Sequence, residues 1–215
     1  MSNENKIVAG ICLFFFIIIA FLFWKGPSLG QPTTTAVNSD ILVKDLSHMT
    51  GKKGAKVTVV EFGDYQCPAC AAVNPEIKKL TAVYKTNPEF NFVFRNFPLS
   101  QHKNAIIAAE AAESAGAQGK YFEMDNLLYE NQQEWGESAD PKPLLSKYAA
   151  GLALDMLKFQ TDMTAHTFVP VIQADTNDGQ TIGIDHTPTV YINGTEQRDL
   201  QFESMKKVVD GLLTK

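Results

Sequence analysis

Two cysteines separated by two residues constrain the fold of this chain more than any other feature of its sequence. The motif Cys-Pro-Ala-Cys occupies residues 67–70 and follows a largely apolar run, residues 56–62, that is typical of a buried strand. After the motif, apolar side chains recur at helical spacing, at Val73, Ile77, Leu80 and Tyr84. The pattern predicts that the motif lies where a strand passes into a helix, with Cys67 in the first helical turn.

This placement has a chemical consequence for Cys67. A helix N-terminus presents free N–H groups and the positive end of the helix dipole, and both favour a thiolate over a thiol. The pKa of such a cysteine falls from about 8.5 to roughly 3.5–7.5. Pro68 lacks an N–H and has a preset φ, so it fits an early helical position at little cost. Two sulfurs three residues apart on one turn are close enough to form and break a short disulfide.

The number of cysteines narrows what this pair does. Only three occur in 215 residues, too few for a scaffold held together by disulfides, so the pair is redox-active or metal-binding. A zinc site would need both cysteines and two of the four histidines, His48, His102, His166 and His186. Without a second CxxC or an HxxxH motif, redox chemistry fits better, and we expect no metal. The net charge of −5 argues against a nucleic-acid surface.

The N-terminal segment predicts a membrane anchor. Residues 7–24 carry no charge and are just long enough to cross the hydrocarbon core of a bilayer. Lys6 and Lys25 bracket this run, and Cys12 inside it is interpreted as an apolar filler. The prediction is an uncleaved transmembrane anchor over residues 1–25. The alternative is a cleaved signal peptide, against which stands the absence of a small-x-small site after the run.

A tether and a globular domain are expected to follow the anchor. Residues 26–45 offer little that could be buried and predict a flexible tether, with a short first strand over Ile41–Leu46. The domain would then occupy residues 46–215. Within it, residues 90–97 alternate with period two and predict a strand. Because strand, helix and strand follow one another over residues 56–95, the two strands are expected to be parallel.

A helical insertion is expected to separate the two parts of the sheet, over about residues 102–183. The predicted helices are His102–Ala117, Lys120–Trp135, Pro141–Ala153, Asp155–Ala165 and Pro170–Thr181, and the acidic residues of 123–137 are expected on solvated helix faces.

The sheet is expected to resume at residues 187–192. Asn193-Gly194 is a strong hairpin signal, with 195–199 as the returning strand, although residues 193–195 also match a glycosylation sequon. A last helix would place one apolar face on the sheet, with Phe202, Met205, Val208, Val209, Leu212 and Leu213.

This order of elements resembles a thioredoxin fold with an inserted helical domain. Within that superfamily the chain is similar to the membrane-anchored, DsbA-like thiol:disulfide oxidoreductases, and residues 95–99, 111–113 and 118–122 are similar to that group as well. The resemblance covers roughly residues 45–215. It implies an α/β protein: a thioredoxin fold with an inserted helical domain, preceded by one N-terminal transmembrane helix.

The resemblance also implies roles for particular residues. Cys67 matches the exposed nucleophile and Cys70 the buried resolving cysteine. Pro188 matches a cis-proline that faces the disulfide, and Thr187 before it would present backbone groups to an extended substrate peptide. Glu61 stands where the family has a buried acid, whose raised pKa would suit a proton acceptor for Cys70. The alternative for Glu61 is a salt-bridged strand residue.

The function that the resemblance implies is thiol–disulfide exchange without a bound cofactor. The expected enzyme introduces disulfides into unfolded exported proteins that carry cysteine thiols, and a membrane redox partner reoxidises its Cys67–Cys70 pair. Such chemistry belongs outside the cytoplasm. We therefore expect a monomer with a single span in the bacterial cytoplasmic membrane and its catalytic domain on the extracytoplasmic, periplasmic or outer, side.

Three residues depart from the strongest oxidases of this family and keep alternatives open. Pro68 and Ala69 replace a pair that includes histidine, and Thr187 stands where valine is common. One alternative is a reductase or isomerase of the same fold, although residues 26–48 leave no room for the dimerisation domain typical of the isomerases. An alternative of another class is a non-catalytic peptide-binding or chaperone module, for which two retained cysteines would be unnecessary.

Overall fold

A five-stranded mixed sheet lies at the centre of the fold in the computed structural model, which describes residues 36–215. The sheet has the order β1-β3-β2-β4-β5, with bounds β1 His48–Met49, β2 Val57–Gly63, β3 Phe90–Asn96, β4 Thr189–Ile192 and β5 Thr195–Gln197. β2 and β3 pair in parallel, from Val57 opposite Phe90 to Gly63 opposite Asn96, which confirms the expected strand–helix–strand unit. The other neighbours in this sheet pair antiparallel.

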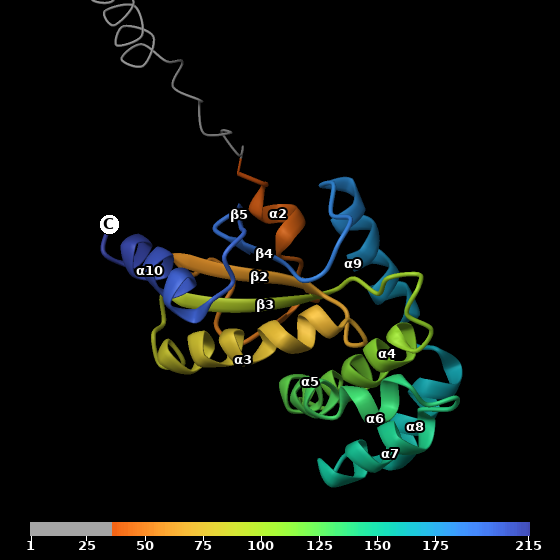
Figure 1. Cartoon of the computed structure of the whole chain (residues 1–215). Coiled ribbons are helices and arrows are strands. Elements are labelled where there is room, and N and C mark those ends of the chain that lie inside the picture. The colour runs from red at the N-terminus through yellow and green to blue at the C-terminus, as the bar shows by residue number, and fades with distance from the viewer. Residues whose placement is uncertain (1–35) are drawn as a thin grey trace, which may run out of the picture. The chain divides into compact units, whose positions relative to one another are not determined.

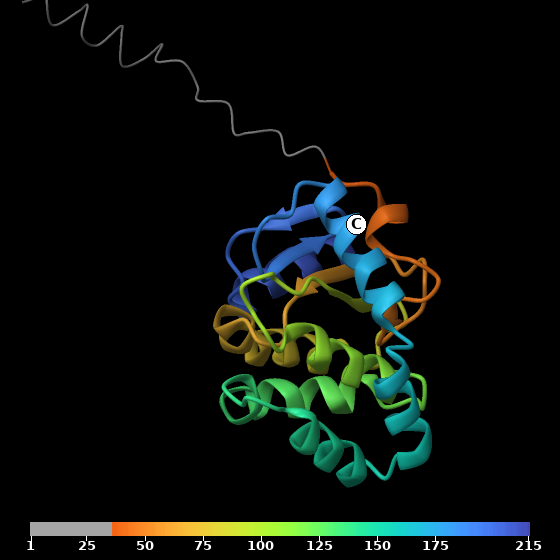
Figure 2. The ribbon, with the colours of Figure 1, turned by 90° about the vertical axis from the view of Figure 1, so that its right-hand side faces the viewer.

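The sheet is covered on both faces because its buried strands alternate between two apolar clusters. Val57 and Val59 of β2 face α3 (Pro68–Val83) and α10 (Phe202–Leu213). Val60 and Phe62 face the other way, toward α2 (Ser39–Leu42) and the C-terminal part of α9 (Val169–Thr181). Figures 1 and 2 show this layered arrangement, with α3 on one side of the strands and α2 and α9 on the other.

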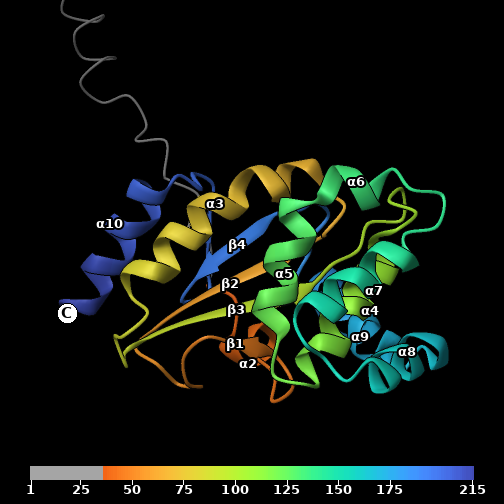
Figure 3. The ribbon, with the colours of Figure 1, turned by 90° about the horizontal axis from the view of Figure 1, so that it is seen from below.

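Six helices lie between β3 and β4 in the sequence. Their bounds are α4 Ala105–Gly116, α5 Tyr121–Glu130, α6 Gln132–Gly136, α7 Lys142–Gly151, α8 Met156–Ala165 and α9 Val169–Thr181. The prediction of a single helix over 120–135 is wrong, because the helix is interrupted at Asn131, between α5 and α6. There the Asn131 side-chain amide donates to the Leu127 carbonyl at 2.9 Å and ends α5. Figure 3 shows α5 beside α3 on the same face of the sheet.

The hairpin between β4 and β5 follows the sequence prediction. Asn193 and Gly194 both have positive φ, 46° and 80°, as a tight hairpin turn requires. The Asn193 side chain accepts from the Thr58 backbone N–H and donates to the Lys56 carbonyl, so its amide is used inside the fold. The contacts favour the turn interpretation over glycosylation.

The structure of residues 36–45 differs from the flexible tether that the sequence predicts. Instead of flexible chain and a strand over 41–46, they form α2, whose N-cap Asn38 accepts from the Asp40 N–H. Leu42 is buried in the second apolar cluster, and the Val37 N–H donates to the Gly194 carbonyl at 2.8 Å. The prediction is wrong here because the segment is mostly polar, and the few apolar side chains that pack against the sheet do not stand out in its composition.

The predicted anchor over residues 1–25, and residues 26–35 of the predicted tether, lie outside the described residues. Within residues 36–215, no helix is both long and apolar enough to cross a membrane.

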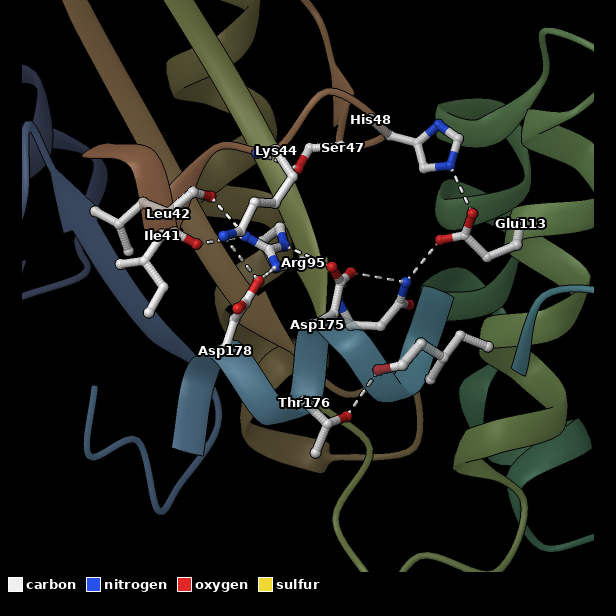
Figure 4. Close-up of polar contacts among 12 residues, drawn as sticks. Ile41, Leu42, Lys44, Ser47, His48, Arg95, Glu113, Asp175, Thr176 and Asp178 are labelled. Carbon is white, nitrogen blue, oxygen red and sulfur yellow. Dashed lines mark hydrogen bonds and ion pairs between the residues drawn. The ribbon is translucent and has the colours of Figure 1, made fainter. Parts of the chain in front are cut away.

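A buried arginine fixes the α2 segment to the sheet. Arg95 of β3 is fully buried and donates from Nε to Asp175 at 2.7 Å and from Nη2 to Asp178 at 2.6 Å. Its Nη1 donates to the backbone carbonyls of Ile41 and Leu42, at 2.8 and 3.0 Å. Figure 4 shows these groups converging from α2, β3 and α9. We call these five residues the Arg95 cluster; each guanidinium nitrogen in it has a partner.

Candidate active site

Cys67 lies at the start of α3, as the sequence predicts. It is the N-cap residue of that helix, and Pro68 is the first helical residue. The Cys67 N–H donates to the Asp64 carbonyl at 3.0 Å, which turns the chain from the end of β2 into the helix. The sulfur therefore faces the free N–H groups of the first helical turn.

The surroundings of Cys67 favour its thiolate. A hydrogen bond from the Cys70 thiol, helped by the backbone N–H groups of Cys70 and Ala69, lowers the pKa of Cys67 to about 5 although partial burial opposes the shift. Cys67 is 6% exposed, and Cys70 is not exposed at all. The expected exposed nucleophile is thus a nearly buried sulfur that is still the more accessible of the pair.

Cys70 has the opposite electrostatic character. Burial, the hydrogen bond to Cys67 and the negative charge of Glu61 all raise the pKa of the Cys70 thiol far above its usual range. At neutral pH the reduced pair therefore holds one thiolate, at Cys67, and one thiol, at Cys70.

The loop before β4 faces the sulfur of Cys67. The peptide bond between Thr187 and Pro188 is cis, and the Thr187 carbonyl oxygen lies 3.4 Å from Cys67 Sγ. The Thr187 hydroxyl is buried and has no hydrogen-bond partner among the described residues, so it is free to donate to a thiolate. The structure thus brings Thr187 and Pro188 to the cysteine motif from a position about 120 residues later in the chain.

Glu61 lies on β2 beneath the motif and is 1% exposed. Burial, with smaller contributions from the charges of Asp125 and Cys67, raises the pKa of Glu61 to about 8. Its Oε1 has no hydrogen-bond partner, and within residues 36–215 it forms no ion pair. The alternative interpretation of a salt-bridged strand residue is therefore wrong, and Glu61 is a buried acid close to Cys70.

The site contains a second buried acid, Asp125 of α5, whose burial differs from the sequence prediction. It was expected on a solvated helix face, but it is 7% exposed, and burial raises its pKa to about 7 against the opposing effects of Tyr65 and Lys78. A signal was present in the sequence, because Tyr121 and Tyr129 stand four residues on either side of Asp125.

The helical insertion also fixes the loop that leads into the motif. The Gln132 side chain donates to the carbonyls of Tyr65 and Cys67, at 2.8 and 2.9 Å. Gln66 donates to the Gly136 carbonyl and accepts from the Asn104 N–H. No local pattern predicts these contacts, since they join a strand-to-helix loop to residues 38–70 positions later.

The comparisons with known proteins agree with this geometry. The family model described as Thioredoxin matches residues 44–211. The chain belongs to the thioredoxin family. It is similar to crystallised BdbD from Bacillus subtilis in its oxidised form, with a TM-score of 0.69, 26% identity, and coverage of 79% of this chain and 94% of that one. This match confirms the resemblance to DsbA-like proteins inside the thioredoxin family.

Two groups of curated relatives share this thioredoxin domain. The probable disulfide bond formation protein D of Bacillus cereus is 29% identical over 170 residues, which cover 77% of this chain and 78% of that protein. The Na(+)/H(+) antiporter NhaA 1 of Salinispora arenicola is 37% identical over 151 residues, 70% of this chain. Our chain spans only 22% of that antiporter's length, so the likeness concerns one segment of it.

Proposed function

We propose that this protein thiol:disulfide oxidoreductase works in the oxidising direction and introduces disulfides into exported proteins. The observation that carries the proposal is the asymmetry of the two thiols, with the pKa of Cys67 lowered to about 5 and that of Cys70 raised. Stabilising the Cys67 thiolate stabilises the reduced enzyme. The oxidised enzyme consequently gives up its disulfide readily.

The reaction starts from the oxidised pair. A substrate thiolate attacks Cys67 Sγ, a mixed disulfide forms, and the bond to Cys70 breaks with its electron pair on the Cys70 sulfur. That sulfur takes a proton, because its pKa is high. A second substrate thiolate then attacks the substrate sulfur of the mixed disulfide and releases Cys67 as a stable thiolate. The substrate has lost two electrons and gained a disulfide.

The cis-proline loop is suited to bind the substrate chain. The buried Thr187 carbonyl lies against Cys67 Sγ. An extended peptide that adds to this loop like a strand would bring its own cysteine to the same sulfur. Glu61, directly beneath, takes the role of proton donor and acceptor for Cys70.

The cellular setting is part of the proposal. Residues 7–24 form an uncleaved, single-pass anchor in the bacterial cytoplasmic membrane, and the catalytic domain lies on its extracytoplasmic side, where disulfides persist. A membrane redox partner restores the Cys67–Cys70 bridge of a monomeric enzyme after each turnover.

A reductase of the same fold is the second candidate. Pro68 and Ala69 in the motif and Thr187 before the cis-proline favour it, because they differ from the residues of the strongest oxidases. The two directions differ in the state that the enzyme holds at rest.

Thiol trapping in intact cells separates these directions. Free thiols are alkylated during lysis and the alkylated chain is resolved from the disulfide form. A resting enzyme that is mostly disulfide supports the oxidase, whereas a mostly dithiol pair overturns it. Cys67→Ser serves as the control, since it cannot form the bridge, and its loss of oxidative refolding of a reduced protein substrate separates an enzyme from a binding module.

A further inference from the structure

The proposed reaction requires a proton to reach Cys70 from solvent, and the face above the motif is unsuited to supply it. Cys70 is fully buried and Glu61 is 1% exposed. During exchange, a substrate peptide on the loop of Thr187 and Pro188 covers Cys67, the more accessible sulfur of the pair. Each turnover changes the protonation of Cys70 once in each direction, so a route is needed on another side.

A cavity reaches Glu61 from the side of the helical insertion. Its volume is about 230 Å³, enough for several waters, since one water takes about 30 Å³ of liquid. It lies between α3 and α5 against β2 and β3, and Figure 3 shows these two helices side by side over the strands. Its polar lining provides the partners that ordered water needs: Thr50, Glu61, Asn74, Lys78, Asp125 and Asn126.

The lining of the cavity includes residues at the protein surface. Thr50 is exposed, and Lys78 and Asn126 are partly exposed. Thr50, Thr81 and Phe122 also line a larger surface pocket of about 700 Å³, so the two spaces are adjacent.

Asp125 lines the same cavity as Glu61 and lies near enough for its charge to raise the pKa of Glu61. The Oε1 atom of Glu61 is buried without a hydrogen-bond partner among the described residues, as a proton acceptor waiting for water would be. The groups that face the two acids are Lys78 of α3, Tyr65 of the loop after β2, Tyr121 and Tyr129 of α5, and the two cysteines.

From these observations we propose that Asp125 relays protons between solvent and Glu61 through water in this cavity. Asp125 is then a positioning residue for the proton, contributed by the helical insertion, and it acts on Cys70 only through Glu61. The proposal rests on the proposed function for the chemistry at Cys70, whichever direction the electrons take.

The relay balances in both half-reactions. When the Cys67–Cys70 bond breaks, the Cys70 sulfur receives the proton of the Glu61 carboxyl group. The Glu61 carboxylate is then reprotonated from solvent by way of Asp125. When an oxidant forms a mixed disulfide at Cys67, the Cys70 thiol gives its proton to Glu61 and attacks Cys67, and the proton leaves along the same route.

The test is Asp125→Asn in the full-length chain, held in detergent micelles. The oxidised enzyme is mixed rapidly with dithiothreitol in weakly buffered solution. The rate of reduction is measured, and a pH indicator follows the net proton release, because dithiothreitol gives up two protons and Cys70 retains only one of them. We expect about a 10-fold slower reaction, less than the roughly 10²–10⁴-fold of direct acid–base catalysis, because water still fills the cavity. Imidazole, a small diffusible proton donor, should restore the rate. The pH profile of the Asp125→Asn enzyme should also move to lower pH, because the Asp125 charge no longer raises the pKa of Glu61.

Two further variants control the experiment. Asp125→Glu keeps a carboxyl group in the cavity and should retain most of the rate. Glu123→Gln removes a charge from the exposed face of the same helix and should change nothing. An Asp125→Asn enzyme with unchanged rate, or one slowed equally with and without imidazole, would overturn the relay.

Failure of the relay and failure of the proposed function give different results. If the wild-type enzyme oxidises a reduced protein substrate and Asp125→Asn does so equally fast in weak buffer, only the relay falls. Suppose instead that the wild-type enzyme does not oxidise that substrate, but that Asp125→Asn still slows the reaction with dithiothreitol and imidazole restores its rate. The proposed oxidase function is then refuted, and the relay is supported.

Discussion

The two faces of the sheet bury charged groups in opposite ways. Glu61 and Arg95 lie one residue out of register on the paired strands β2 and β3, and they point to opposite faces. Arg95 has two carboxylate partners and two carbonyl partners. Glu61 has no partner for its Oε1 within residues 36–215 and lies near a second acid instead.

Burial therefore has two different roles in this protein: it stabilises the fold around Arg95, and it prepares Glu61 for proton exchange. A buried charge that is fully paired stays in one state, and removing one partner is costly. A buried acid without a partner shifts its pKa into the physiological range and becomes able to exchange a proton at neutral pH. The Arg95 cluster therefore fixes α2 and α9 to the sheet, whereas the opposite face holds the reactive pair.

The largest expected effect is at the cysteine motif, on the face of the sheet that holds the reactive pair. Cys67→Ser should reduce thiol–disulfide exchange to background, because it removes the nucleophile. The free energy of unfolding of the reduced protein should change by less than about 3 kcal/mol. Oxidative refolding of a reduced substrate and a urea titration measure the two quantities, and residual turnover above background would contradict the assignment.

Arg95→Leu should have the reverse pattern. It removes the guanidinium from Asp175 and Asp178 and leaves them only Asn96 and Lys44 as partners among the described residues. Breaking a buried ion pair costs about 3–5 kcal/mol of stability. The pKa of Cys67 should stay at about 5, since Arg95 does not contribute to it. A urea titration together with the pH dependence of Cys67 alkylation checks both. A shift of that alkylation midpoint in the folded variant would show that the two faces are coupled.

Glu61→Gln should change how stability depends on pH. The pKa of Glu61 is raised from 4.5 to about 8 in the folded chain, so its contribution is fully present below pH 4.5 and is lost as the pH rises through 8. Each pKa unit corresponds to about 1.4 kcal/mol. Between these pH values the wild-type reduced protein should lose stability relative to the variant. Parallel stability curves for the two proteins would mean that Glu61 titrates normally.

The smallest effect is expected at an exposed pair. Lys120 lies 2.9 Å from Glu123, with both side chains nearly half exposed. Lys120→Met should alter the free energy of unfolding by less than about 0.5 kcal/mol and leave exchange unchanged. This variant sets the baseline for the others, and a loss comparable to that of Arg95→Leu would contradict the account of pairing and burial.

Residues whose contacts are local in the chain could be predicted from the sequence, whereas residues that contact distant elements could not. The motif, the strand before it and the helix after it are adjacent in the chain, so local periodicity places Cys67 and Cys70. Thr187, Pro188 and Glu61 entered only through the resemblance to a family, because their proximity to the motif depends on the fold. Arg95, Asp125 and Gln132 act through contacts between distant elements, and the packing of α2 depends on a few apolar side chains. Periodicity carries none of that information.

Redox titration of the Cys67–Cys70 pair against glutathione tests the central claim most directly. The asymmetric thiols predict an oxidising couple, at about −200 mV or above, closer to protein disulfide isomerase and DsbA than to thioredoxin. A couple as low as that of thioredoxin, about −270 mV, would contradict the claim that the stabilised Cys67 thiolate makes this enzyme an oxidant.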